Sequence, residues 1–368
     1  MSNEIMDNEQ LQSKVIKFLR FPLIVGVVLI HTQLTTINGV EGDTQLPQSF
    51  HGAFPIYETV SYLVAHLLAR IAVPLFFVFS GFLFFYKTQE FTAKIYRQKL
   101  VKRMRTLFVP FLFWNILFVC FFNVKQRFIP DSSAPVIGEG YATVRDWLLV
   151  FWNYRESGYP VSLQFWFIRD LMVVVLFTPF IYWLTQKMHY SFSLLLGFLW
   201  FMGWWFDVVG FGIDALFFFS LGAYFSIANK SFVGRIKTCT LPLGLLFLAL
   251  IVMSYCTSNY GWNIYMYRAC VLLGVVFAIA WVAAKIERRK WTENTFLSES
   301  SFFVFAYHLI AIPIVKRILF SVIPCTTDLL AVALYFLWAA LVVVLGLLLY
   351  WLSKKCFPKI TAIVTGGR

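Results

Sequence analysis

The sequence is poor in charge, and poorest in acidic residues. Only 13% of its 368 residues are charged, with 18 Asp and Glu against 31 Lys and Arg, while 60% are hydrophobic. Because soluble domains carry about 25% charged residues, this composition excludes a water-soluble fold. It also excludes a disordered chain, since disordered segments have few aromatic residues, whereas this chain has 42 Phe and 13 Trp.

Several motifs of catalysis and metal binding are missing as well. The six cysteines form no Cys-x-x-Cys pair, which argues against a disulfide scaffold and a zinc ribbon. No His-Glu-x-x-His element and no Ser-His-Asp order stand out, and no internal repeat is visible. We therefore predict no metal site and no permanently bound cofactor. Alternating polar and apolar strands are absent too, so a membrane β-barrel is not expected.

What the sequence does contain is a series of long apolar runs. Stretches of about 20 such residues span the hydrocarbon layer as helices. We predict a single membrane-embedded domain over residues 1–368, an all-α polytopic fold of about ten transmembrane helices. Their expected ranges are 17–37, 60–86, 107–123, 166–184, 191–208, 211–228, 239–257, 264–284, 299–320 and 329–352.

The positions of Lys and Arg predict the orientation, because cytoplasmic loops hold most of them. With the N-terminus inside, only Lys125, Arg127, Arg145 and Arg155 fall in outer loops. Both termini are thus expected in the cytoplasm, and the expected location is the bacterial inner membrane. The net charge of +13 is then mainly an orientation signal, so we expect membrane lipids and no nucleic acid as partners.

Ionisable residues at membrane depth are the candidate functional groups, since such charges usually face a cavity, a partner or a substrate. Arg20 and His31 are eleven residues apart, which is three helical turns plus about 20° and a rise of about 16 Å, so both lie on one helix face. Arg70 and His308 are expected near mid-depth, at the height of His31. A membrane anchor at Arg20 and a packing histidine at position 31 are the structural alternative.

Further candidates lie toward the two membrane surfaces. Near the outer one, seven ionisable residues together predict a polar vestibule that is open outward, while any single one of them is also explained by pairing or by reaching to the membrane surface: Arg169, Asp170, Asp207, Asp214, Arg268, Lys316 and Arg317. The expected substrate contacts are Trp166, Arg169, Asp170, Asp214 and Arg268. On the inner side, Lys and Arg occupy half of positions 94–105. This basic segment either lies on anionic lipid or binds a phosphate-rich ligand.

Several of these residues together resemble a known family. They are Arg20-x10-His31, the string VPLFFVFSGFLFF at 73–85, the basic segment, Trp166-Phe167-Ile168-Arg169, and Tyr307-His308-Leu309. The pattern resembles the acyltransferase-3 family of integral-membrane O-acyltransferases. The resemblance implies a cytoplasmic acyl-CoA donor, usually acetyl-CoA, and an acceptor hydroxyl on a carbohydrate or glycolipid at the outer face.

The resemblance also carries residue roles. The family's first-helix pair maps to Arg20 and His31, and its inner-face Arg-x-x-Arg maps to 102–105, where Lys102 replaces the first arginine and Arg105 is the second. Arg20, Lys102, Arg103 and Arg105 are therefore the expected acyl-CoA contacts.

The remaining roles follow from side-chain chemistry. His31 is expected to be the general base or a transient acyl carrier, because imidazole exchanges protons near neutral pH. Arg70 is expected to stabilise an oxyanion or to position the acceptor, and His308 to orient His31 or to act as a second base. A proton- or anion-coupled transporter or flippase that uses His31, Arg70 and His308 as a relay is the alternative function. The oligomeric state, the acceptor and the acyl chain length stay open.

Overall fold

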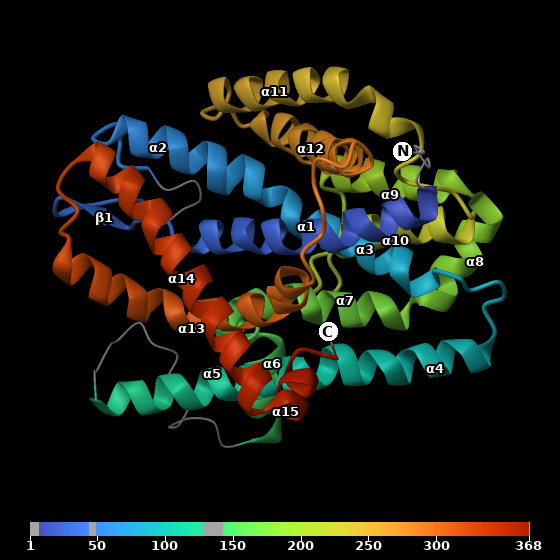
Figure 1. Ribbon diagram of the computed structural model, residues 1–368, viewed down its shortest axis with the longest axis horizontal. Helices are drawn as coiled ribbons and strands as arrows, with labels where there is room; N and C mark the ends of the chain where they lie inside the picture. Colours follow the sequence, from blue (N-terminus) through green and yellow to red (C-terminus); the bar gives the residue numbers. More distant parts are fainter. Residues whose placement is uncertain (1–6, 44–48, 129–142, 368) are drawn as a thin grey trace.

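The computed structural model describes residues 7–43, 49–128 and 143–367, and these are overwhelmingly helical (Figure 1). Strands β1 (Thr36–Ile37) and β2 (Val40–Glu41) form one short antiparallel hairpin in this part of the chain. The prediction of an all-α fold is thereby confirmed. The helices are α1 (Asn8–His31), α2 (Pro55–Ser61), α3 (Ala72–Phe85), α4 (Ala93–Arg103), α5 (Val109–Phe128), α6 (Val144–Trp152), α7 (Trp166–Leu176), α8 (Thr178–Met188), α9 (Tyr190–Met202), α10 (Ile213–Ile227), α11 (Thr240–Cys256), α12 (Asn263–Glu287), α13 (Thr295–Val322), α14 (Asp328–Cys356) and α15 (Pro358–Val364).

Each predicted span overlaps one or more of these helices, but not every helix is long enough to cross a bilayer alone. Among the described residues, six helical stretches are long and apolar enough: Pro55–Phe85, Ala93–Phe128, Ile236–Cys256, Asn263–Glu287, Thr295–Val322 and Asp328–Cys356. A seventh arises if α7 and α8, which are bent by 64°, count as one span. The chain is thus an integral membrane protein, while the number ten and the orientation stay predictions.

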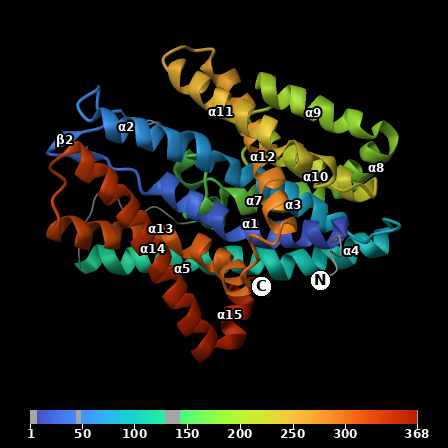
Figure 2. The same ribbon diagram turned by 45° about the horizontal axis from the view of Figure 1, so that its top comes forward.

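Helix α1 occupies the centre of the bundle. It packs against α3, α12, α13 and α14, and it lies between the α11–α12 pair and the α13–α14 pair in both ribbon views (Figures 1 and 2). One face of α1 buries Leu11, Val15, Leu19 and Leu23 at helical spacing. A second stripe of the same helix lines a cavity.

Helices α3 and α10 cross in direct backbone contact. A Cβ on Gly81 would lie 2.0 Å from the carbonyl oxygen of Phe219, and one on Gly222 would lie 1.9 Å from that of Val78. Only glycine permits this approach, as small residues do at many membrane helix crossings. Gly81 in the family-like string therefore has a packing role.

The backbone departs from α-helix just before α3. Residues Tyr62–Leu68 form a π-helical segment (η1), and Ala69–Ile71 form a 3₁₀ turn (η2). Pro74 follows, and because proline lacks an N–H and clashes with the carbonyl four residues earlier, it disfavours a regular helix through position 70. Arg70 consequently sits on a tight turn. Such irregular turns inside helices are frequent at functional sites.

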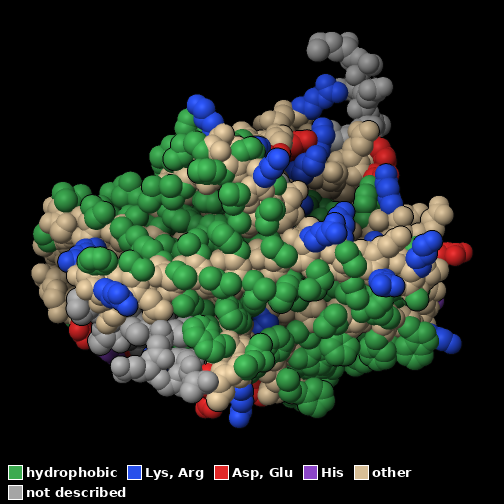
Figure 3. Space-filling view, turned by 90° about the horizontal axis from the view of Figure 1, so that it is seen from below, with side chains coloured by type: hydrophobic (Ala, Val, Ile, Leu, Met, Phe, Trp, Pro, Cys, Tyr) green, Lys and Arg blue, Asp and Glu red, His purple; other side chains and the backbone are tan. Residues whose placement is uncertain are grey.

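The surface fits a bilayer environment. Figure 3 shows a broad apolar face, with Lys and Arg side chains more numerous toward the right-hand end. In Figure 1 that end holds α4 and the start of α1, whereas the β1–β2 hairpin, the start of α2 and the α13–α14 connection lie at the opposite end. There the Asp328 carboxylate accepts hydrogen bonds from the backbone N–H groups of Ile56 (2.9 Å) and Tyr57 (2.7 Å). These bonds tie the start of α14 to the start of α2.

Candidate active site

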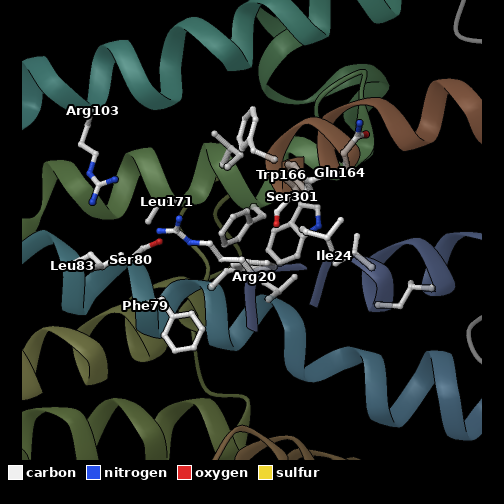
Figure 4. A pocket seen from close by; sticks show the side chains of 18 of the residues that line it. Arg20, Ile24, Phe79, Ser80, Leu83, Arg103, Gln164, Trp166, Leu171 and Ser301 are labelled. Atoms are coloured by element: carbon white, nitrogen blue, oxygen red, sulfur yellow. The ribbon is translucent and has the colours of Figure 1, made fainter. Parts of the chain in front are cut away.

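A cavity of about 660 Å³ lies inside the bundle, lined by side chains from α1, η2, α3, α4, α7 and α13 (Figure 4). This volume is within the range of pockets that hold small molecules, about 300–1,000 Å³. Its walls combine aromatic and aliphatic side chains with a small set of polar and basic ones.

One stripe of α1 lines the cavity along its length. Arg20, Ile24, Val27 and His31 all contribute to the wall, and their spacings of four, three and four residues follow the helical repeat. Figure 4 shows Arg20 reaching from α1 into the cavity. The prediction that Arg20 and His31 share one helix face is confirmed, and that face borders a cavity.

A basic group gathers where α4 meets the cavity. Lys99, Lys102 and Arg103 line the wall together with Arg20, and Figure 4 shows Arg103 entering from α4. The Phe84 ring lies 5.2 Å from the Lys99 ammonium and 5.7 Å from the Arg103 guanidinium, and Lys99 also donates to the Phe84 carbonyl. Cation–π contacts of this kind orient both cations.

Not all of the predicted acyl-CoA contacts line the cavity. Lys102 and Arg103 line the cavity, but Arg105 is exposed and does not. A π-helical segment, Met104–Phe108 (η3), begins directly after Arg103 and changes the helical phase there. Sequence reasoning also did not single out Lys99. The signal was present, because positions 99, 102 and 103 follow the spacing that places residues on one helix face.

The two histidines at membrane depth are neighbours. The ring centroids of His31 and His308 are 5.3 Å apart. His308 is fully buried, and its Nδ1 lies 2.5 Å from the Phe305 carbonyl oxygen. A carbonyl only accepts, so Nδ1 carries a proton, and Nε2 of the neutral ring is then an acceptor. That Nε2 is buried without a partner in the described part of the chain.

Arg70 lies at the junction of two hollows. It lines the cavity that contains His31, and it also lines a second pocket formed by η1, η2 and the α11–α12 turn. Its Nε is buried and has no hydrogen-bond partner among the described residues. Because a buried donor without a partner costs about 1–3 kcal/mol, this guanidinium is suited to bind a ligand oxygen.

The Lys and Arg side chains in the described lining make the cavity positively charged. Its described lining includes five cations, Arg20, Arg70, Lys99, Lys102 and Arg103, and no Asp or Glu. Positive groups in a water-poor cleft attract anions more strongly than the same groups in water. The arrangement thus suits a ligand that carries several negative charges. Within the described ranges, no group of three or more His, Cys, Asp or Glu side chains is placed to bind a metal.

Residues of the predicted outer vestibule have partners within the protein. Arg169 and Asp170 make a buried ion pair of 2.8 Å, and Arg169 also donates to the carbonyls of Trp152 (2.6 Å) and Gly158 (2.9 Å). These bonds fasten residues 152–158 to α7. Neither residue lines the cavity, whereas Trp166, one turn earlier, does.

Asp214 and Arg268 also have contacts within the protein. The Trp200 indole donates to Asp214 over 2.7 Å, and Arg268 donates to the Phe201 carbonyl over 2.7 Å. Both bonds hold the end of α9, and neither residue lines the cavity or the second pocket. Substrate binding by Arg169, Asp170, Asp214 and Arg268 therefore stays a prediction without support from the cavity lining.

Gln164 is a cavity residue that sequence reasoning missed. It is buried, its amide nitrogen donates to the Ala306 carbonyl (2.9 Å), and its amide oxygen accepts from the Ser162 hydroxyl (2.9 Å). These bonds hold the segment before α7 against α13. The only signal in the sequence was a polar amide just ahead of an apolar helix, which is too common to single out one residue.

Comparisons with known proteins agree with this picture. A family model described as an acyltransferase domain matches residues 14–355. The succinoglycan biosynthesis protein ExoH of Rhizobium meliloti is similar, with 27% identity over 181 residues. The aligned region covers 47% of this chain and 43% of that relative, so it spans less than half of each. No solved structure matches the chain. Because the family model covers almost the whole sequence, the chain belongs to the acyltransferase-3 family of membrane acyltransferases.

Proposed function

We propose that this protein is an O-acyltransferase that moves an acyl group, acetyl in the simplest case, from cytoplasmic acyl-CoA to a hydroxyl of a carbohydrate or glycolipid at the outer face. One observation carries the proposal. A single cavity is lined both by the basic group Arg20, Lys99, Lys102 and Arg103 and by His31. Groups that attract an anion and a side chain that accepts a proton thus border the same space.

The basic group is suited to the phosphates of CoA. Lysine ammonium groups offer point charges, and arginine guanidinium groups offer paired donors that match phosphate oxygens. Between Arg20 and His31 the α1 stripe is apolar, with Ile24 and Val27 in the wall. The rise of about 16 Å along this stripe is the length that the thioester arm has to cover. The thioester carbonyl then lies beside His31.

The proposed chemistry is a direct acyl transfer. His31 removes the proton of the acceptor hydroxyl while that oxygen attacks the thioester carbonyl carbon. Arg70 stabilises the negative charge on the carbonyl oxygen of the tetrahedral intermediate. When the intermediate collapses, the carbon–sulfur bond breaks, and the CoA thiolate takes the proton from the His31 imidazolium. The products are an ester on the acceptor and free CoA. An acyl-imidazole on His31 is the rival route to the same products.

His308 has a positioning role in this proposal. Its ring contacts His31, and its own Nδ1 is held by the Phe305 carbonyl. A neutral ring beside His31 does not oppose the formation of the His31 imidazolium, as a second cation would. The unpartnered Nε2 is an acceptor, and accepting from the His31 ring would select the tautomer of that base.

The acceptor class is supported by the relative. That protein is named for succinoglycan biosynthesis, which favours a polysaccharide or its lipid-linked precursor as the acceptor here. The proposed site of transfer at the outer face follows from the predicted orientation of α1, whose His31 end is the outer one.

Two measurements test this function. The thermal stability of the purified protein should rise with CoA or acetyl-CoA, because a ligand that binds the folded state stabilises it. Mass spectrometry of envelope glycans from cells with and without the gene should show an ester that disappears in the deletion strain. If CoA does not change the thermal stability and the glycans of the two strains are identical, the acyltransferase function is refuted and the transporter is favoured.

A further inference from the structure

A second pocket, of about 380 Å³, lies between η1, η2 and the turn that joins α11 to α12. It is lined mainly by His66, Arg70, Ser258, Tyr260, Asn263 and Tyr267. The α11–α12 turn belongs to the end of the molecule that is expected outside. Arg70 is shared with the cavity that holds His31. A molecule bound in this second pocket therefore lies directly beside the proposed oxyanion site.

Two polar atoms at this pocket lack partners. Nδ1 of His66 and Nε of Arg70 are both buried without a hydrogen bond to any described residue. Leaving such atoms without a hydrogen bond is unfavourable, so both favour a polar ligand. A hydroxyl group suits either atom, because it accepts from the guanidinium and either donates to or accepts from the imidazole nitrogen.

The imidazole is held rigidly by aromatic neighbours. The His66 ring centroid lies 4.9 Å from that of Tyr62 and 5.0 Å from that of Tyr267, with which it is stacked. The Tyr62 hydroxyl is in turn fixed by a hydrogen bond of 3.2 Å to the Ser254 carbonyl. The position of the free imidazole nitrogen is thus set before any ligand binds, and such preorganisation strengthens binding.

The rest of the lining offers acceptors and ring faces. Asn263 uses its amide nitrogen to donate to the Ser254 carbonyl (2.6 Å) and the Thr257 hydroxyl (2.9 Å), so its side chain presents an acceptor oxygen. Tyr260 is 59% exposed and gives the pocket an open aromatic face. Aromatic faces are electron-rich and attract the C–H bonds of a sugar ring.

We infer that this second pocket binds a sugar ring of the carbohydrate acceptor and presents one of its hydroxyls at Arg70. The inference rests on the proposed function and adds the acceptor subsite to it. A phosphate or another multiply charged group fits less well, because Arg70 is the one Lys or Arg in the described lining. The mixture of aromatic faces, an amide oxygen and unsatisfied nitrogens matches an uncharged polyol.

The test uses two variants of the full-length protein in proteoliposomes. His66→Phe keeps an aromatic ring between Tyr62 and Tyr267 but removes the polar nitrogen, and Tyr267→Ala removes the ring face. Tyr265→Ala is the matched control, since Tyr265 lies two residues away on α12, packs on Phe201 (ring centroids 5.7 Å apart) and does not line the pocket. The acceptor probe is the glycan fraction from the deletion strain, and acetyl-CoA is the donor.

Loss of one hydrogen bond should raise the KM for the glycan about three- to tenfold in His66→Phe, with kcat and the KM for acetyl-CoA unchanged. Tyr267→Ala should behave alike, and Tyr265→Ala should match the wild type. If the wild type is active and both His66→Phe and Tyr267→Ala keep the wild-type KM for the glycan, the proposed subsite alone is refuted. A wild type that does not acetylate the glycan at all would instead refute the proposed function.

Discussion

At the scale of single residues, the two histidines that touch differ in what they can do. His31 lines the cavity. His308 is fully buried, does not line the cavity and is hydrogen-bonded to a backbone carbonyl. A base has to reach its substrate, so only His31 is placed to act on one directly. His308 acts through His31, which makes it a positioning residue.

Replacement of His31 should separate chemistry from donor binding. We expect His31→Ala to lower kcat about 10²- to 10⁴-fold, the usual contribution of a general base, while thermal stabilisation by CoA persists. His189→Asn is the control, because His189 is exposed in the α8–α9 turn and asparagine tolerates its positive φ of 52°. Wild-type turnover in His31→Ala would remove the base role.

The basic residues of α4 provide a second comparison between neighbours. Arg103→Ala should raise the KM for acetyl-CoA about tenfold or more, because charge-assisted hydrogen bonds contribute about 1.5–3 kcal/mol. Arg105→Ala should leave it unchanged, since Arg105 is exposed and outside the cavity. Initial rates over a range of donor and salt concentrations give both values, and equal effects of the two variants would contradict the assignment.

At the scale of helices and turns, the function depends on how segments are fastened together. Arg169 is paired with Asp170 on α7 and joins this helix to residues 152–158 through the carbonyls of Trp152 and Gly158, and both charged side chains are almost fully buried. Removing one member of a buried pair leaves the other charge without compensation. Loss of this pair is thus expected to lower the stability of the fold and to leave substrate affinity unchanged.

Asp170→Asn should test that assignment. The free energy of unfolding should fall by about 3–5 kcal/mol, the typical cost of breaking a buried pair, while the KM for the acceptor in the folded fraction stays unchanged. Asp207→Asn is the matched control, because Asp207 is exposed. Thermal unfolding followed by size-exclusion chromatography checks the stability, and a raised acceptor KM at wild-type stability would restore Asp170 as a substrate contact.

The α3–α10 crossing allows a similar test of packing. In Gly81→Ala the new Cβ would lie 2.0 Å from the Phe219 carbonyl oxygen, so the helices have to separate. We expect a loss of at least about 1–3 kcal/mol of stability. Gly261→Ala places a methyl group with no atom of the described chain within 4 Å and should have little effect. Similar melting temperatures for the two variants would disprove the close crossing.

At the scale of the whole molecule, the central question is which end faces the cytoplasm. Helix α12 joins the turn at 257–262 to the connection at 288–294, so its two ends report on opposite sides of the bundle. The predicted orientation places the basic group of the cavity inside and the second pocket outside. Donor and acceptor then approach from different compartments.

Two single cysteines should reveal that orientation. In a variant without the six native cysteines, Gly261→Cys should react with a membrane-impermeant maleimide on intact cells, whereas Lys290→Cys should react only after the cells are opened. The native residues at both positions are exposed, so access through the membrane is the only difference expected. The reverse labelling pattern would invert the orientation and, with it, the proposed direction of transfer.

Much of the fold was predictable because it depends on local rules. Apolar runs of about 20 residues predicted where helices lie, and the 3.6-residue repeat placed Arg20 and His31 on one face. The pairing of His31 with His308 was suggested only by similar depth. The sequence predicts spans over 191–208 and 166–184, whereas the structure has the short helix α9 in the first range and a bend of 64° between α7 and α8 in the second. Composition alone does not reveal where a helix ends or bends.

A helical membrane protein with Arg20 and His31 on one helix face was predictable from the amino-acid order alone, because hydrophobicity and helical periodicity act within one segment. Other features came from packing between segments: Lys99 lines the cavity whereas Arg105 does not, Arg169 fastens residues 152–158 to α7, and Arg70 borders two pockets. These outcomes depend on contacts between segments far apart in the chain and on the irregular turns around positions 62–71 and 104–108. Such contacts are set by packing, and no local pattern encodes them.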